Sequence, residues 1–138
     1  MEFIDDQLLN KVSEEAKQSP RKRMNYNFHQ SLDDKCHRML NALEPGTEIP
    51  IHRHPTKDET FVILSGKVKV FTYNSRGDMV EYALLSREDG MIGVNIPINT
   101  WHTIQCIEPA VLFECKEGPF VPHEEEGILV MEDVRGKK

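Results

Sequence analysis

Residues 46–66 read GTEIPIHRHPTKDETFVILSG, and their spacing carries the most specific information in the sequence. His52 and His54 lie two residues apart, so in an extended chain their imidazoles point to the same face. The segment 55–58 is predicted to turn, and Glu59 then opens a returning strand from which its carboxylate reaches back toward the two rings. Two imidazoles on one face supply half of a four-ligand metal site, and the carboxylate of Glu59 adds a third ligand.

A fourth ligand of the same kind follows a turn at 97–99. His102 shares its strand face with Ile104 and Cys106 at period two, so a mostly apolar wall carries one more imidazole. The three histidines and Glu59 can therefore converge on one point. Cys106 fits either a fifth ligand or a small buried apolar residue, and the second interpretation is favoured.

The chain around this stretch predicts an all-β fold. A short N-terminal helix is indicated by Leu8, Leu9, Val12 and Ala16, with Asp5 or Asp6 as cap and Pro20 as its end. Period-two segments separated by turn residues then predict about eight strands, which suits a jelly-roll barrel. They are 24–28, 36–43, 59–64, 67–73, 79–85, 92–96, 101–107 and 110–116. The predicted organisation is a helix over 1–20, a barrel over 21–117 and an extended arm over 118–138.

The spacing of Gly46, His52, His54, Glu59 and Gly66 resembles the first cupin motif, G-x5-H-x-H-x4-E-x6-G, at every position. The second motif, G-x5-P-x-G-x2-H-x3-N, is met with one extra residue between Gly90 and Pro97, with Asn99 for Gly and with Cys106 for Asn. The resemblance implies a single-domain cupin, a double-stranded β-helix or jelly-roll barrel. It also implies one divalent metal held by His52, His54, Glu59 and His102.

A narrower resemblance, to the WbuC family of cupin-fold metalloproteins, rests on three segments. They are RMNYNFH (23–29), HRHPTKDETF (52–61) and GPFVPHEEE (118–126). The resemblance implies work on a sugar or nucleotide-sugar in the biosynthesis of surface polysaccharide such as O-antigen. It names no reaction.

Composition excludes several other classes of function. With 17 Lys and Arg against 23 Asp and Glu the formal net charge is −6, which argues against nucleic acid and anionic membranes as partners. The longest apolar runs have four residues, as at 61–64, far short of a membrane span or a signal-peptide core. Three cysteines without a CxxC pair indicate a reducing compartment, so we expect a cytoplasmic protein.

A candidate substrate-binding face precedes the metal motif. Arg23, Asn25, Asn27 and His29 alternate with apolar residues, so one side of this strand offers only hydrogen-bonding groups. Such a face can line the mouth of a cup, where Arg23 holds a carboxylate or phosphate bidentately. The alternation also fits an ordinary solvated strand, and the cluster 21–23 is interpreted as a surface feature.

The function expected from these features is a metal-dependent isomerase or epimerase acting on a small sugar-derived ligand. Three imidazoles and one carboxylate suit Fe, Ni, Mn, Co or Zn. His29 and Glu114 are weak candidates for a proton-shuttling group, and no catalytic residue is identified. The alternatives are an Fe(II)-dependent dioxygenase and a non-catalytic small-ligand-binding cupin. Exposed edge strands and the apolar helix favour a homodimer.

Overall fold

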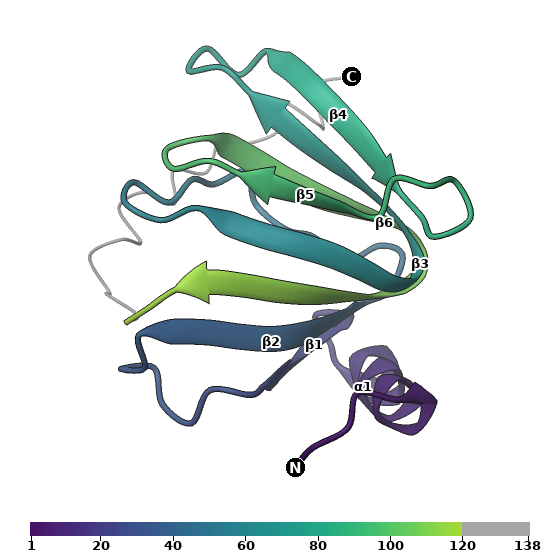
Figure 1. Ribbon diagram of the computed structural model, residues 1–138. Coiled ribbons are helices and arrows are strands. Elements are labelled where there is room, and N and C mark those ends of the chain that lie inside the picture. Colours follow the sequence, from purple (N-terminus) through teal and green to yellow (C-terminus); the bar gives the residue numbers. More distant parts are fainter. Residues whose placement is uncertain (120–138) are drawn as a thin grey trace.

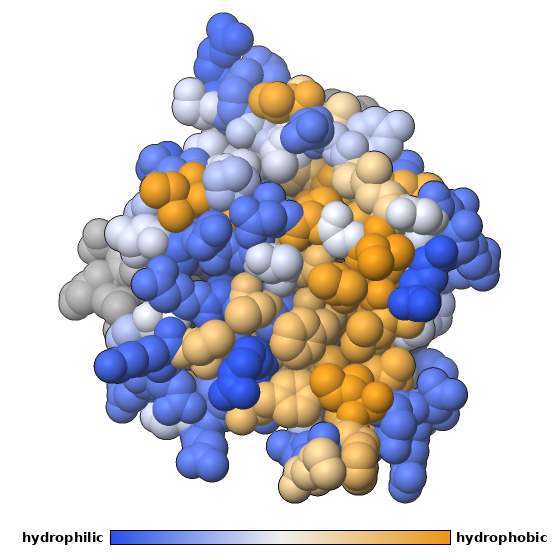
Figure 2. Space-filling view, viewed as in Figure 1, coloured by the Kyte–Doolittle hydropathy of each residue, from blue (hydrophilic) through white to orange (hydrophobic). Residues whose placement is uncertain are grey.

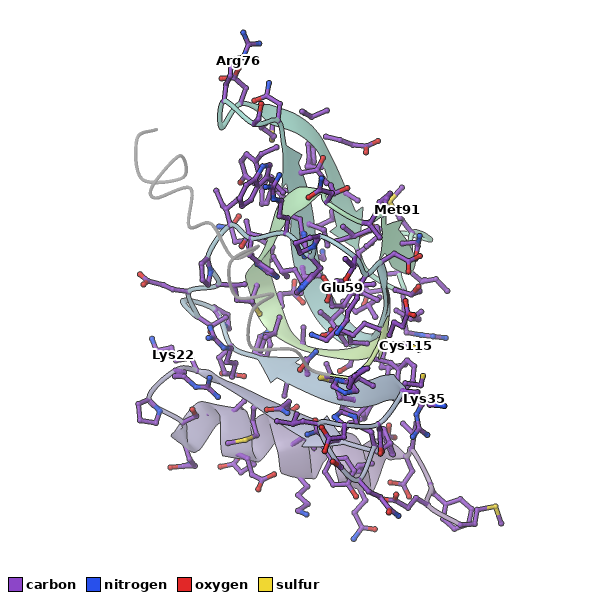
Figure 3. The ribbon with its side chains drawn as sticks, turned by 90° about the vertical axis from the view of Figure 1, so that its left-hand side faces the viewer. Lys22, Lys35, Glu59, Arg76, Met91 and Cys115 are labelled. Carbon is purple, nitrogen blue, oxygen red and sulfur yellow. The ribbon has the colours of Figure 1, made fainter. Side chains whose placement is uncertain are left out.

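The computed structural model describes residues 1–119 of the chain, which form one helix and six antiparallel strands. The elements are α1 (Asp6–Gln18), β1 (Arg23–Asn27), β2 (Cys36–Leu43), β3 (Glu59–Tyr73), β4 (Met79–Leu85), β5 (Gly93–Ile96) and β6 (Trp101–Glu117). The strands pair in the order β1-β2-β6-β3-β4, and β5 pairs with β3 (Figure 1). The sheet curves around an interior in which Glu59 lies (Figure 3). The predicted all-β fold with one short helix is confirmed.

α1 begins and ends where the sequence predicts. The carboxylate of Asp5 accepts a hydrogen bond from the backbone N–H of Leu8 at 3.0 Å, so Asp5 is the N-cap. Val12 and Ala16 are fully buried and pack on Leu40 of β2 and Val111 of β6. The helix therefore covers the outer face of the sheet and leaves its inner face to the interior.

Two pairs of predicted strands are each continuous in the structure, so the separation into eight strands was wrong. The segments 59–64 and 67–73 form β3, and 101–107 and 110–116 form β6. The breaks predicted between 64 and 67 and between 107 and 110 are bends, and the register between the two long strands shifts there. Gly66 has φ +82°, and a Cβ at this position would lie 2.1 Å from the carbonyl oxygen of Pro109. The two bends thus touch, and only glycine permits the contact.

The principal core fills the inside of the curved sheet. Phe61, Ile63, Ile104 and Cys106, which the period-two pattern places inward, are all buried within it. Asn99 stands where the second cupin motif has glycine, and its φ is +64°. Asn tolerates this left-handed conformation better than other residues with a side chain, so the substitution preserves the turn before His102.

Some apolar surface is left uncovered. Figure 2 shows apolar side chains gathered in a band on the face seen in Figure 1. Edge strand β4 exposes Met79 (49%), Val80 (65%) and Tyr82 (58%). Within residues 1–119 no helix is long and apolar enough to cross a membrane. Of the arm predicted for 118–138, all but the first two residues lie outside the described part.

Candidate metal centre

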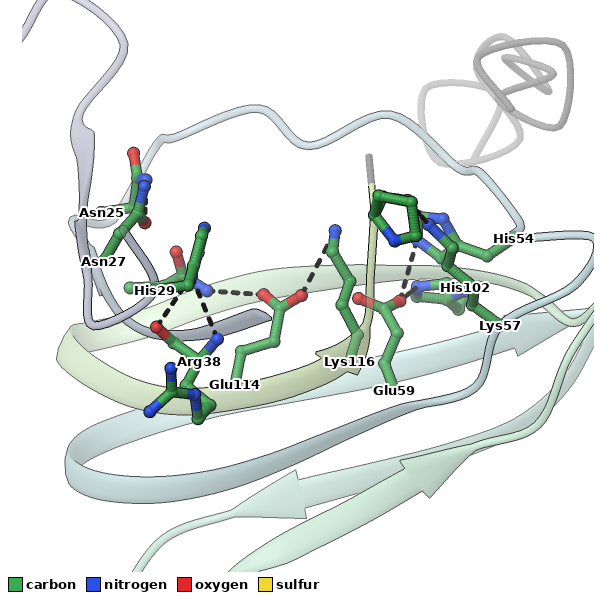
Figure 4. Close-up of polar contacts among 12 residues, drawn as sticks. Asn25, Asn27, His29, Arg38, His54, Lys57, Glu59, His102, Glu114 and Lys116 are labelled. Carbon is green, nitrogen blue, oxygen red and sulfur yellow. Dashed lines mark hydrogen bonds and ion pairs between the residues drawn. The ribbon is translucent and has the colours of Figure 1, made fainter. Parts of the chain in front are cut away.

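The four predicted ligands come from three places in the fold and meet at one point. Figure 4 shows three of them, His54, Glu59 and His102. Glu59 is the first residue of β3, His102 is the second of β6, and His52 and His54 lie in the segment before β3. One ligand atom from each of the four lies within 4.8 Å of the others. The sequence interpretation placed His52 and His54 on one face of a strand. In the structure neither residue belongs to a regular strand. A single antiparallel bridge between His52 and His102 fixes the segment instead.

The atoms that face one another at this point are buried and lack hydrogen bonds of good geometry. Glu59 Oε1 lies 3.0 Å from His54 Nε2 and 2.8 Å from His102 Nε2. Among the described residues, none of these three atoms has a hydrogen-bond partner of acceptable geometry. Buried polar atoms without partners are costly unless a ligand satisfies them. Two nitrogens and a carboxylate oxygen aimed at one point are what a divalent metal requires, so the residues fit a metal ion.

Backbone carbonyls fix the orientation of two of the rings. His52 Nδ1 donates to Pro50 O and His102 Nδ1 donates to Thr100 O, each at 2.8 Å. A ring that donates from Nδ1 keeps a lone pair on Nε2, and such contacts commonly orient metal-binding histidines. Burial, with a smaller contribution from His102, lowers the pKa of His52 to about 4. The His52 ring is therefore neutral near pH 7, as a metal ligand must be.

A second buried carboxyl group, that of Glu114, lies beside Glu59. Burial and the charge of Glu59 raise the pKa of Glu114 to about 8. For Glu59, burial acts in the opposite sense to its close polar contacts with His102, His54 and Glu114, and these contacts prevail, so its pKa lies well below the usual range. Asn41 Nδ2 donates to Glu114 Oε1 at 2.7 Å, and Lys116 Nζ lies 3.6 Å from Glu114 Oε2. The site thus pairs an ionised carboxylate with a neutral carboxylic acid.

A cavity of about 390 Å³ opens onto these groups. Its wall is apolar where the core reaches it, as at Phe61 and Leu112, and polar elsewhere. The polar residues that line it are Arg21, Arg23, Asn25, Asn41, His52, His54, Glu59, Glu114 and Lys116. The volume is that of a small-molecule site.

Only part of the polar face predicted for β1 lines the cavity. Arg23 and Asn25 line the cavity, but Asn27 and His29 are not among the lining residues. Asn27 accepts a hydrogen bond from Asn25 at 2.7 Å. His29 is buried beside Arg38, whose backbone N–H donates to its Nδ1 at 3.1 Å, and it stacks on His37 at 4.2 Å between ring centroids. The structure therefore does not bring His29 to the four ligands.

Sequence reasoning missed Asn41 and Lys116 and gave Glu114 only a minor role. All three lie on the inner face of β2 or β6, in alternation with residues that face α1. The sequence contained one signal for Glu114, a carboxylate at an inward position of a strand whose neighbouring residues are apolar. Cys106, by contrast, lies in the core, where its Sγ contacts the carbonyl oxygens of Leu43 (3.4 Å) and Glu108 (3.0 Å), and it is outside the ligand group.

One protein-family model, described as a domain of unknown function (DUF6016), matches residues 4–85, more than half of the chain. No curated protein matches the chain significantly.

Solved structures resemble the chain in fold. The capsular polysaccharide assembling protein CapF from Staphylococcus aureus is 24% identical with a TM-score of 0.64, over 76% of this chain and 30% of CapF. This chain therefore spans less than a third of CapF. TT1209 from Thermus thermophilus is 24% identical with a TM-score of 0.62, over 85% of this chain and 97% of that protein. A cupin superfamily protein from Desulfitobacterium hafniense is 14% identical with a TM-score of 0.55, over 69% and 76%. These likenesses show a cupin fold.

Proposed function

We propose that this chain, which belongs to the family described as a domain of unknown function (DUF6016) and folds as a cupin, binds one divalent metal and acts on a small sugar-derived ligand. The metal ligands are His52, His54, Glu59 and His102. The observation that carries the proposal is the meeting of His54 Nε2, His102 Nε2 and Glu59 Oε1, all buried and all without well-formed hydrogen bonds among the described residues. The metal, one of Fe, Ni, Mn, Co or Zn, supplies Lewis-acid polarisation of a ligand oxygen.

The residues around the ligands divide the remaining tasks. Glu114 is the group that donates and accepts a proton, because it is buried beside Glu59 and held by Asn41 at 2.7 Å. Arg23 and Asn25 hold the polar groups of the ligand from the wall of the cavity that β1 provides. Asn27 orients Asn25 through their hydrogen bond. No observation gives His29 a role at the metal, and it remains a prediction of the sequence alone.

An isomerase or epimerase of a sugar or nucleotide-sugar is the reaction class that this arrangement favours. A carboxyl group with a pKa near 8 populates both protonation states near neutral pH. Its ionised form can take a proton from a carbon beside a polarised carbonyl, and the neutral form that results can return the proton to the carbon. The structural likeness to CapF, a capsular polysaccharide assembling protein, supports a role in surface polysaccharide biosynthesis. The narrower assignment to the WbuC family and a cytoplasmic location remain predictions.

We also propose that the chain forms a homodimer through its exposed apolar surface. β4 lies at one edge of the sheet and exposes Met79, Val80 and Tyr82, so a second copy would cover both an open edge and apolar side chains. Light scattering coupled to size-exclusion chromatography tests this, with Val80→Asp and Tyr82→Asp as the disrupting variants. A monomer for the wild-type chain contradicts the dimer.

The metal assignment is tested by elemental analysis of protein purified without chelator, followed by titration of the apoprotein. We expect close to one equivalent of a first-row divalent metal per chain. The absence of metal together with no uptake on titration contradicts the proposal.

The reaction class is tested separately, with the metal-loaded protein and a panel of nucleotide-sugars in D₂O. Isomerase or epimerase activity exchanges a carbon-bound hydrogen for deuterium, which NMR detects, and Glu114→Gln should abolish the exchange while the metal content is unchanged. Consumption of O₂ by the iron-loaded protein would instead favour a dioxygenase. Tight ligand binding with neither exchange nor O₂ consumption would favour a non-catalytic binding protein.

A further inference from the structure

We propose that Arg21, Lys22 and Arg23 form a phosphate-binding subsite at the mouth of the metal cavity. The inference rests on the proposed function and deepens it, since it names the class of ligand: a phosphorylated sugar, bound by its phosphate at these cations and by its hydroxyl and carbonyl oxygens at the metal centre.

The first observation is a second cavity that adjoins the first. Its volume is about 310 Å³, and residues from 20–23 line it together with Gly46 and Glu48. Arg21 and Arg23 line this cavity and the metal cavity alike. A molecule that fills both cavities therefore passes between two guanidinium groups. Guanidinium groups bind phosphate oxygens bidentately and with charge assistance.

The second observation is that these cations form no ion pairs among the described residues, although Glu48 lines the same cavity. Within residues 1–119, none of the three forms an ion pair with a carboxylate, although the chain as a whole carries a net charge of −6. The polar contact of the Arg23 side chain is from Nη1 to the carbonyl oxygen of Glu48, at 2.5 Å. Burial and the neighbouring Arg21 both lower the pKa of Arg23. An anion placed between the two guanidinium groups relieves this repulsion.

The third observation is that the backbone holds the cluster in place. Lys22 has φ 58°, in the left-handed region that residues with a side chain rarely adopt. Its N–H donates to Ser19 O at 3.0 Å, its carbonyl oxygen accepts from Glu44 N at 2.9 Å, and Thr47 Oγ1 donates to Arg21 O at 2.7 Å. These contacts fix the backbone from which the three basic side chains extend at the cavity mouth, so less backbone entropy is lost on binding.

Gly46 makes room for the lysine of the cluster. It has φ +93°, and a Cβ built at this position would lie 3.2 Å from Lys22 Nζ. The ammonium group of Lys22 therefore rests over the glycine at a distance that a larger residue would crowd. This glycine is the first residue of the motif that supplies His52, so the loop that carries the metal ligands also supports the cationic cluster.

The reach between the two sites limits the size of the ligand. Glu48 lines the cationic cavity and His52 belongs to the proposed metal centre, and these two residues are four positions apart in the chain. Fully extended, they span at most about 14 Å. A hexose with a phosphate or diphosphate group fits within this reach. A hexose 1-phosphate and a nucleoside diphosphate-sugar share this chemistry.

The experiment measures binding of pyrophosphate by calorimetry to the apoprotein, because pyrophosphate would also chelate a bound metal. The variant Arg21→Ala/Lys22→Ala removes two exposed cations of the cluster and leaves the half-buried Arg23 in place. The control Arg76→Ala/Arg87→Ala removes two exposed cations elsewhere, so the net charge changes equally. We expect at least tenfold weaker binding in the first variant and affinity within twofold of the wild type in the control. Equal effects in the two variants, or no binding by the wild-type chain, would overturn the subsite.

Two further measurements identify the class of ligand and test the phosphate subsite independently of the metal site. Glucose 1-phosphate that binds as tightly as UDP-glucose points to a sugar phosphate, and much tighter UDP-glucose binding points to a nucleoside diphosphate-sugar. Metal content is measured on the same samples. Normal metal content without pyrophosphate binding overturns the subsite and leaves the metal site standing. Pyrophosphate binding without metal uptake supports the subsite and overturns the metal site.

Discussion

The backbones of His52 and His102 exchange two hydrogen bonds, of 3.0 and 2.8 Å, although the two residues are far apart in the chain. This bridge attaches an otherwise irregular segment to the long strand β6. The backbone of His54 is held by a separate contact, because its carbonyl oxygen accepts a hydrogen bond from Asn99 N at 2.7 Å. A site whose ligands are held before the metal arrives loses less entropy on binding it.

Glu59→Gln should weaken metal binding strongly, because it replaces the only charged ligand of the group. With metal at a hundredfold excess over the wild-type Kd, binding adds about 2.7 kcal/mol to the free energy of unfolding, and the variant should lose most of this gain. Asp58→Asn is the matched control, since Asp58 is exposed and adjacent in the chain. Melting temperatures with and without metal provide the measurement. An equal metal-dependent gain in both variants would show that Glu59 is not a ligand.

The pKa of His52, lowered to about 4, predicts acid sensitivity of the apoprotein. The unfolded chain takes up a proton on this ring near pH 6.5, whereas the folded chain does so only near pH 4. Stability is therefore complete above about pH 6.5 and is lost as the pH falls toward 4, by at most about 3 kcal/mol. Urea unfolding of wild type and His52→Gln between pH 7.5 and 4 measures the difference. Identical pH profiles for the two proteins would contradict the prediction.

The contribution of Glu114 to the stability of the folded protein changes with pH in the opposite direction to that of His52. Its pKa is about 8 in the folded protein and 4.5 in the reference state, so its contribution to stability is present below about pH 4.5 and is lost as the pH rises to 8. Gln resembles the protonated form and keeps an acceptor for Asn41. The apoprotein carrying Glu114→Gln should therefore gain stability over wild type between pH 5 and pH 9, by at most about 5 kcal/mol. Glu117→Gln, an exposed change on the same strand, is the control and should show no such gain.

Gly66→Ala should destabilise the fold severely, because its Cβ would meet the carbonyl oxygen of Pro109 at 2.1 Å and its φ is +82°. We expect a loss of more than about 3 kcal/mol, since backbone atoms cannot move aside. Gly90→Ala separates strain from collision, because Gly90 has φ +83° but open space at the Cβ position. That variant should lose only about 1 kcal/mol, the usual cost of the left-handed conformation. Thermal unfolding of both variants tests the comparison, and equal losses would contradict it.

Features that depend on local spacing could be predicted from the amino-acid sequence alone. Alternation placed Phe61, Ile63 and Ile104 inward, and the motif spacing selected four residues that the structure brings to one point. The cap, predicted at Asp5 or Asp6 and found at Asp5, and the apolar face of α1 follow from rules that act within one or two turns of helix. Such features are readable because neighbouring residues in the chain remain neighbours in the structure.

Features that depend on contacts between distant segments could not be predicted in this way, and the folded structure was needed to find them. The pattern predicts strand breaks near Gly66 and Pro109, yet each residue bends a continuous strand, because the two bends pack on each other. Glu114 takes its raised pKa from burial and from Glu59, which β3 places beside it, so no local pattern around Glu114 contains that information. The cluster 21–23 resembles an ordinary charged surface until the loop at Gly46 folds against it at the cavity mouth. Burial and charge interactions act through space, and the order of residues along the chain does not specify those distances.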